Sequence, residues 1–182
     1  AVGVSTLDDL YRDVPRDMLL TGENAAHAKV LRLQCGETVT VCDGVGQDLT
    51  CVVSDVSPGQ ISLVVQSREA SRAEPPVACS VYMAYAKADK LELVVQKAVE
   101  LGAAEVVPVL SERCISRPDA KSMENRLTRL NRIARAAAEQ SGRGVLPVVS
   151  PPVPFPQMLE GLLAADLGFA CYEGEREYKL RD

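Results

Sequence analysis

The chain has 182 residues, of which 47% are hydrophobic and 25% charged, and its net charge is −5. This composition fits a globular protein with one large domain or two small ones, and it excludes a disordered chain. It also excludes a protein that is basic over its whole surface, and the longest apolar runs are too short to span a bilayer.

Six cysteines are scattered without a C-x-x-C pair, and His27 is the sole histidine. This spacing excludes a clustered zinc site and favours buried, reduced thiols of a cytoplasmic protein over paired disulfides. The first residues lack a basic stretch followed by an apolar core, so we expect no secretory signal there.

The N-terminal part predicts a short helix followed by β-strands. Residues 24–33 fit a helix capped by Asn24 and ended by Gly36. The β-branched runs 38–43, 47–56 and 60–67 predict strands separated by turns, typical of a small β-barrel or sandwich. The "DGVG" string between the first two is interpreted as a hairpin turn; a phosphate-binding loop is the alternative.

After a charged and prolyl stretch at residues 67–76, strands and helices alternate. The predicted strands are 77–86, 104–110, 144–150 and 166–173, and the predicted helices are 89–102, capped by Asp89, 122–140 and 156–165. This alternation indicates a parallel sheet with crossover helices. We therefore expect a β-rich domain at 1–70, a linker at 71–76 and an α/β domain at 77–182.

Positive charge is concentrated in residues 111–143, which hold eight basic and four acidic residues. This window carries +4 and the remainder −9, which favours one side that faces a polyanion. A solvated helix face explains the charge equally well.

Ligands of an open parallel sheet bind at the carboxyl ends of its strands. Three polar loops follow predicted strands, and their candidate residues are Lys87, Asp89, Lys90, Ser111, Glu112, Arg113, Arg117, Tyr172 and Glu173. The stretch "EQSGR", residues 139–143, ends a helix at the opposite edge, so the rule does not place it at this site. No G-x-S-x-G, P-loop or G-x-G-x-x-G motif is present.

The motifs K-A-D-K (87–90), E-L-G (100–102), S-E-R (111–113) and E-Q-S-G-R (139–143) occur together in order. With them, the chain from about His27 to Glu173 resembles the RsmE family, the 16S ribosomal RNA uridine-N3 methyltransferases of the SPOUT class. The segment that starts at His27 is similar to that family's PUA-like RNA-binding barrel. The resemblance implies an N-terminal small β-barrel and a C-terminal parallel α/β SPOUT-type domain.

The resemblance also implies a function: methyl transfer from S-adenosylmethionine to N3 of a uridine in 16S rRNA of the small subunit, without a metal, by a cytoplasmic homodimer. Arg32, Lys87, Lys90, Arg113 and Arg117 would bind RNA. Glu139, Gln140 and Arg143 would form the catalytic polar rim, with Glu139 the acceptor of the N3 proton, and Tyr172 and Glu173 would border the cofactor.

One feature departs from that family. Its C-terminal trefoil knot carries a glycine-rich loop and a later strand, and the sequence stops at Asp182 before either motif. We therefore expect a domain truncated before the knot and a chain inactive as given. A non-catalytic rRNA-binding module is the competing hypothesis, and a Rossmann-type enzyme fits less well because its glycine motif is absent.

Overall fold

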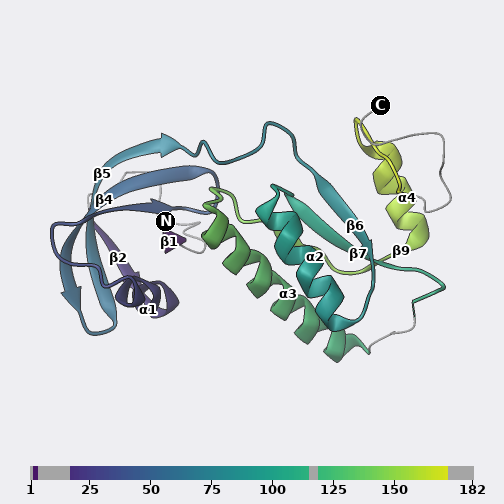
Figure 1. Ribbon diagram of the computed structural model, residues 1–182, viewed down its shortest axis with the longest axis horizontal. Helices are drawn as coiled ribbons and strands as arrows, with labels where there is room; N and C mark the ends of the chain where they lie inside the picture. The colour runs from purple at the N-terminus through teal and green to yellow at the C-terminus, as the bar shows by residue number, and fades with distance from the viewer. Residues whose placement is uncertain (1, 4–16, 115–118, 172–182) are drawn as a thin grey trace.

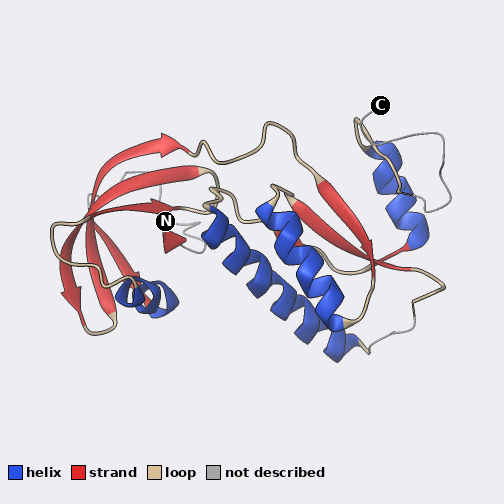
Figure 2. Ribbon diagram, viewed as in Figure 1, coloured by secondary structure: helices blue, strands red, loops and turns tan. Residues whose placement is uncertain are grey.

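The computed structural model describes residues 2–3, 17–114 and 119–171, and these residues form two parts joined side by side (Figure 1). A strongly curved sheet forms the N-terminal part, and a parallel sheet with helices forms the C-terminal part (Figure 2). Among the described residues, no helix is both long and apolar enough to cross a bilayer.

The N-terminal sheet has five strands in the order β1-β3-β4-β5-β2. Their bounds are β1 (Val2–Gly3), β2 (Asp17–Thr21), β3 (Thr38–Cys42), β4 (Gln47–Ser57) and β5 (Gln60–Ala70). The three predicted strands are confirmed as β3, β4 and β5, which form an antiparallel meander. Strand β2 was not predicted, because only Met18 and Leu20 are buried in it and so short an alternation is a weak signal.

Helix α1 (Gly22–Val30) differs in its bounds from the predicted helix. It begins directly after β2, so Asn24 lies inside the helix and is not its N-cap. The Asn24 side-chain oxygen accepts instead from Arg135 Nη2 of a distant helix, at 3.3 Å. The helix also ends well before Gly36, and a turn through Arg32 follows it.

The C-terminal part alternates strands and helices as predicted. Its elements are β6 (Ser80–Ala84), α2 (Ala88–Glu100), β7 (Glu105–Leu110), α3 (Ala120–Ser141), β8 (Val148–Val149), β9 (Val153–Pro154) and α4 (Phe155–Ala164). All strand pairs are parallel; β7 lies between β6 on one edge and the two short strands β8 and β9 on the other. The predicted parallel sheet with crossover helices is confirmed.

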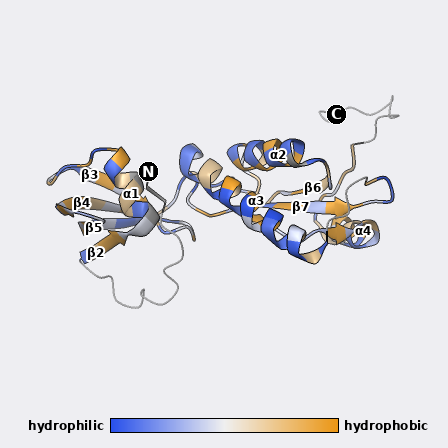
Figure 3. Cartoon of the chain, turned by 90° about the horizontal axis from the view of Figure 1, so that it is seen from below, coloured by the Kyte–Doolittle hydropathy of each residue, from blue (hydrophilic) through white to orange (hydrophobic). Residues whose placement is uncertain are grey.

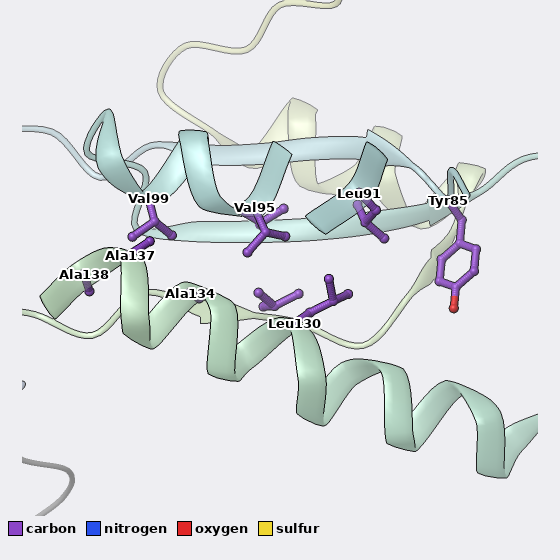
Figure 4. Close-up of a cluster of buried hydrophobic side chains, with 10 residues drawn as sticks. Tyr85, Leu91, Val95, Val99, Leu130, Ala134, Ala137 and Ala138 are labelled. Atoms are coloured by element: carbon purple, nitrogen blue, oxygen red, sulfur yellow. The ribbon is translucent and has the colours of Figure 1, made fainter. Parts of the chain in front are cut away.

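Helices α2 and α3 cover one face of this sheet with a shared core (Figure 4). Leu91, Val95 and Val99 of α2 face Leu130 and Ala134 of α3, and small alanines let the helix backbones approach each other closely. Both helices are banded with hydrophobic and hydrophilic residues (Figure 3), as the helical period of the sequence predicts. Helix α4 packs on the other face, where Gly161 lies against the Tyr82 hydroxyl.

Three local predictions are corrected by the structure. The N-cap of α2 is Lys87, and Asp89 lies within the first turn, because the helix starts one residue earlier than predicted. Of the predicted strand 144–150, only Val148–Val149 pairs in the sheet. Residues 166–171 of the predicted last strand form no strand, and Leu167 and Phe169 are exposed: an apolar run becomes a strand only where a neighbour accepts its hydrogen bonds.

A junction of three segments, residues 44–46, 71–74 and 143–146, connects the two parts. The turn between β3 and β4 reaches across it: Gly46 N–H donates to Gly144 O and Leu146 N–H to Gly44 O, each at 2.9 Å. The "DGVG" string is thus a turn, as interpreted. Its amides are used within the protein, since Asp43 Oδ1 accepts from Val45 and Gln47 at 2.9 Å, and a phosphate-binding loop is excluded.

Candidate nucleic-acid interface

The loops that follow β6 and β7 leave the parallel sheet at the same edge, as expected. Tyr85 N–H donates to Val109 O at 2.8 Å, which holds the first loop against the end of β7. A cavity of about 810 Å³ opens beside the second loop. Its lining is Leu110, Ser111, Glu112, Arg113, Met123, Pro154, Phe155 and Pro156. The S-E-R motif therefore lies at a concave site with apolar walls.

The N-terminus of α2 gives this edge a positive potential. Lys87 is the N-cap and Lys90 lies in the first turn, both exposed, and no described side chain caps the helix. The positive charges of Lys87 and Lys90 are repelled by the positive end of the helix dipole. This repulsion raises the free energy of the turn, and a nearby anion lowers it. Asp89 is the one acidic residue in that turn. These groups together favour an anionic ligand.

Residues 111–114 form a tight turn that presents Arg113 to solvent. Cys114 N–H donates to Ser111 O at 3.1 Å, and Ser111 N–H donates to Cys114 Sγ at 3.4 Å. Arg113 is exposed and lines the cavity. Arg117, predicted in the same loop, lies outside the described residues.

The sequence analysis missed one contact at this edge, between Arg126 of α3 and the loop after β6. The Arg126 guanidinium carbon lies 4.4 Å from the centre of the Tyr85 ring, and Arg126 Nη2 donates to Ala86 O at 2.7 Å. A signal was available: Arg126 stands three residues after Met123 and four before Leu130, on the apolar side of the helix.

The other predicted set, Glu139, Gln140 and Arg143, lies at the far end of α3. Met123, at the cavity, and Glu139 are separated by 16 residues of helix, or about 24 Å. Glu139 Oε1 accepts from Arg135 Nε at 3.0 Å, and Gln140 is exposed. Within one chain, these residues lie far from Lys87 and Lys90 at the start of α2.

Arg143 is buried and its guanidinium is used in the fold. Its Nε and Nη2 donate to Glu74, the latter at 2.7 Å, and its Nη1 donates to Val99 O and Ala103 O at 3.1 and 3.0 Å. Arg143 thus ties the last turn of α2, at Val99, to Ala103 in the loop that follows that helix. This placement gives Arg143 a structural role that the sequence analysis did not foresee.

Glu74 is the centre of the same network. Its carboxylate also accepts from the backbone N–H groups of Gly144 and Val145, at 2.9 and 3.0 Å. Hydrogen bonds from Arg143, with smaller contributions from these two amides, hold the pKa of Glu74 below its ordinary value. Glu74 lies in the predicted linker, and the composition of that segment gave no sign that it pairs with Arg143.

The remaining predicted residues are placed as follows. Arg32 is exposed in the turn after α1, with a positive φ of 55° that is uncommon for a residue other than glycine. Tyr172 and Glu173, predicted to border a cofactor, lie outside the described residues. So does the rest of the loop to which they belong.

The thiols are divided between core and surface. Cys42 and Cys51 are buried, whereas Cys35, Cys79 and Cys171 are exposed, so the expectation of buried thiols holds only in part. Burial raises the pKa of Cys42 to about 12, which makes it a poor nucleophile and metal ligand. In the described ranges, no three His, Cys, Asp or Glu side chains gather as a metal site would need.

Two family models match this chain, in the order of its two parts. An RNA methyltransferase PUA domain matches residues 20–66, and an RNA methyltransferase domain matches residues 73–181. The chain belongs to this RNA methyltransferase family. The predicted PUA-like sheet domain and SPOUT-type parallel α/β domain are both confirmed.

Curated relatives support the resemblance to the RsmE family. Ribosomal RNA small subunit methyltransferase E of Bacillus subtilis is 31% identical over 155 residues, which cover 85% of this chain and 60% of the relative. The Synechocystis protein of the same name is 35% identical over 132 residues, 72% of this chain and 42% of the relative. The chain thus spans about 60% or less of the length of these two relatives.

A solved structure agrees. The ribosomal RNA small subunit methyltransferase E of Neisseria gonorrhoeae, crystallised bound to S-adenosyl methionine, superposes with a TM-score of 0.75 at 28% identity. The superposition covers 87% of this chain and 64% of that one. The Legionella pneumophila protein Lpg2936, with a TM-score of 0.71 at 24% identity, supports the fold.

Proposed function

We propose that this protein transfers a methyl group from S-adenosylmethionine to N3 of a uridine in 16S rRNA of the small ribosomal subunit. The observation that carries the proposal is the cationic carboxyl edge of the parallel sheet, in a chain whose two parts match an RNA methyltransferase and its PUA domain. The relatives that bear the name of a small-subunit rRNA methyltransferase support it.

The RNA would lie along this edge. Lys87, Lys90 and Arg113 are exposed there, and Arg117 belongs to the same loop in the sequence. Cations at a helix N-terminus attract phosphates and release their counterions, which gives affinity without sequence preference. Arg32, exposed on the PUA-like part, would extend the contact to a second stretch of RNA.

The cavity fits the nucleoside part of the cofactor. Its walls are mostly apolar, the Ser111 hydroxyl and Glu112 carboxylate can bind ribose hydroxyls, and its volume lies in the range of small-molecule sites. Tyr172 and Glu173 are proposed to complete this border. When bound, the cofactor supplies an electrophilic methyl group, and the protein's own task is to orient the uridine and accept its N3 proton.

Glu139, Gln140 and Arg143 are proposed to act at the edge of a second copy, in a homodimer. A carboxylate and an amide suit the Watson–Crick edge of an extruded uridine, and Glu139 would accept the N3 proton. Arg143 would act through its anchor to Glu74, which fixes the end of α3. The distance along α3 favours this assignment, because one chain cannot join both sets.

The test is methylation of 16S rRNA and of small subunits by the protein at its full natural length. A methyl group on N3 blocks base pairing, so reverse transcription should stop one nucleotide before the target. We expect the Lys87→Ala, Lys90→Ala double variant to reduce the methylated fraction at least tenfold at subsaturating RNA. Lys97→Ala, at the other end of α2 and paired with Glu100, is the matched control and should retain full activity.

A non-catalytic rRNA-binding module is the alternative. It would bind 16S rRNA with the same dependence on Lys87 and Lys90, yet produce no stop and no labelled methyl group. If the full-length protein binds neither 16S rRNA nor the small subunit, both proposed functions are contradicted.

A further inference from the structure

We infer that Arg126 is a positioning residue that holds the Lys87–Lys90 turn in the conformation in which it binds an RNA phosphate. The inference rests on the proposed RNA contact of these two lysines and extends it to a residue that makes no contact of its own with the ligand. The contacts between α3 and the loop after β6 carry it.

The loop after β6 is fixed at three points. Tyr85 is buried with its ring in the core beside Leu91 and Leu130 (Figure 4), and its N–H donates to Val109 O at 2.8 Å. The third point is Ala86, whose carbonyl accepts from Arg126 Nη2 at 2.7 Å. Arg126 therefore holds the residue that directly precedes Lys87.

The hydrogen bond from Arg126 to Ala86 also fixes the positions of Lys87 and Lys90, because the backbone connects them to Ala86. Lys87 O accepts from the N–H groups of Lys90 and Leu91, at 3.1 and 3.2 Å, so the first turn of α2 is built on Lys87. A shift of Ala86 moves Lys87, and with it the turn that places Lys90. The planar guanidinium suits this task, because it stacks on Tyr85 and donates in its own plane to Ala86.

The guanidinium of Arg126 is not fully satisfied by its contacts within the protein. Its Nε is buried with no hydrogen-bond partner among the described residues, and the Tyr85 hydroxyl is likewise unpartnered. No described carboxylate lies within ion-pair distance of Arg126. A half-buried guanidinium that no described carboxylate neutralises leaves the local potential positive, which favours the approach of an anion. A phosphate held by Lys87 and Lys90 would bring that negative charge.

The experiment compares Arg126→Ala with Arg129→Ala. The second substitution removes the same charge from the next turn of α3, where Arg129 pairs with Glu92 of α2 at 2.9 Å. Each substitution is made in the wild-type and in the Lys87→Ala, Lys90→Ala background, in the full-length protein. Two quantities are measured: affinity for purified 16S rRNA at 0.1 M salt, and hydrogen exchange of the amides of Lys90 and Leu91.

One phosphate contact to single-stranded RNA is worth about fivefold in affinity at this salt concentration. We expect Arg126→Ala to weaken binding at least fivefold in the wild-type background and less than twofold where the lysines are absent. Exchange at Lys90 and Leu91 should accelerate at least tenfold, while amides of β7 stay protected. Arg129→Ala should leave exchange unchanged and act equally in both backgrounds. In Arg126→Lys, which keeps the charge without the planar contact, the amides of Lys90 and Leu91 should also exchange faster than in the wild type.

Equal effects of Arg126→Ala in both backgrounds, or unchanged exchange at Lys90 and Leu91, would overturn the inference. If the double lysine variant binds rRNA as tightly as the wild type, the proposed RNA contact fails. The exchange measurement then still decides whether Arg126 holds the turn.

Discussion

At the scale of single residues, the arginines of the basic window separate into two kinds. Arg113 and Arg132 are exposed, whereas Arg126 and Arg143 make specific contacts within the protein. Counting charge along the sequence could not distinguish them, because burial depends on contacts with residues far away in the chain. The partners of Arg143, Glu74 and Val99, lie 69 and 44 positions away.

We predict that Arg143→Ala destabilises the protein by about 3 kcal/mol, since it removes the cation paired with Glu74 and the donor to Val99 O and Ala103 O. This is the lower end for breaking a buried pair, because the Glu74 side chain stays 22% exposed. Chemical denaturation measures the change. Arg132→Ala, which removes an exposed arginine of α3, should cost less than about 0.5 kcal/mol. Similar losses for both variants would show that the anchor adds no stability.

The same network predicts a dependence on pH. The pKa of Glu74 is lowered in the folded protein, so the ionised carboxylate stabilises the fold above its ordinary pKa, and this stabilisation is lost as the pH falls through the folded value. The free energy of unfolding should therefore decrease below about pH 4.3. Glu74→Gln should be less stable at pH 7 and lose less on acidification. Parallel curves for the two proteins would contradict the assignment.

At the scale of elements, the helices and the long strands were predictable, whereas the N-caps and the short strands were not. The helical period placed α2, α3 and α4 within two residues at nearly every end, because each buries an apolar stripe. Both predicted N-caps were wrong, because Asn24 lies inside α1 and Asp89 lies within the first turn of α2. Of the strand expected at 166–173, the described residues 166–171 form no strand, because a strand needs a neighbour to pair with as well as a suitable sequence.

The end of α3 gives a prediction at this scale. Gly142 has a φ of 70° and closes the helix, with Arg143 N–H donating to Ala138 O at 2.9 Å. Gly142→Ala should cost about 1 kcal/mol, because a Cβ is disfavoured in this conformation, while Gly142→Asn should cost less. Urea denaturation of the three proteins measures the order. An alanine variant as stable as the wild type would contradict it.

At the scale of the whole molecule, the two-part architecture and the gathering of the loops after β6 and β7 at one edge followed from the sequence, because parallel strands end at the same edge of a sheet. The helix pattern also placed "EQSGR" at the opposite edge, but the sequence could not show that this end of α3 lies at the junction of the two parts. The junction depends on the hydrogen bonds of Gly46 with Gly144 and of Glu74 with Arg143, which join segments about 70 to 100 positions apart in the sequence.

The central claim is that ribosomal RNA lies on the carboxyl edge formed by the loops after β6 and β7. The most direct measurement is photocrosslinking of 4-thiouridine-substituted 16S rRNA to the full-length protein, with the crosslinked peptides identified by mass spectrometry. The account predicts crosslinks within residues 85–90 and 111–114, reduced by Lys87→Ala, Lys90→Ala and unaffected by Lys97→Ala. Crosslinks confined to the C-terminal half of α2 or to α4, with none at this edge, would contradict it.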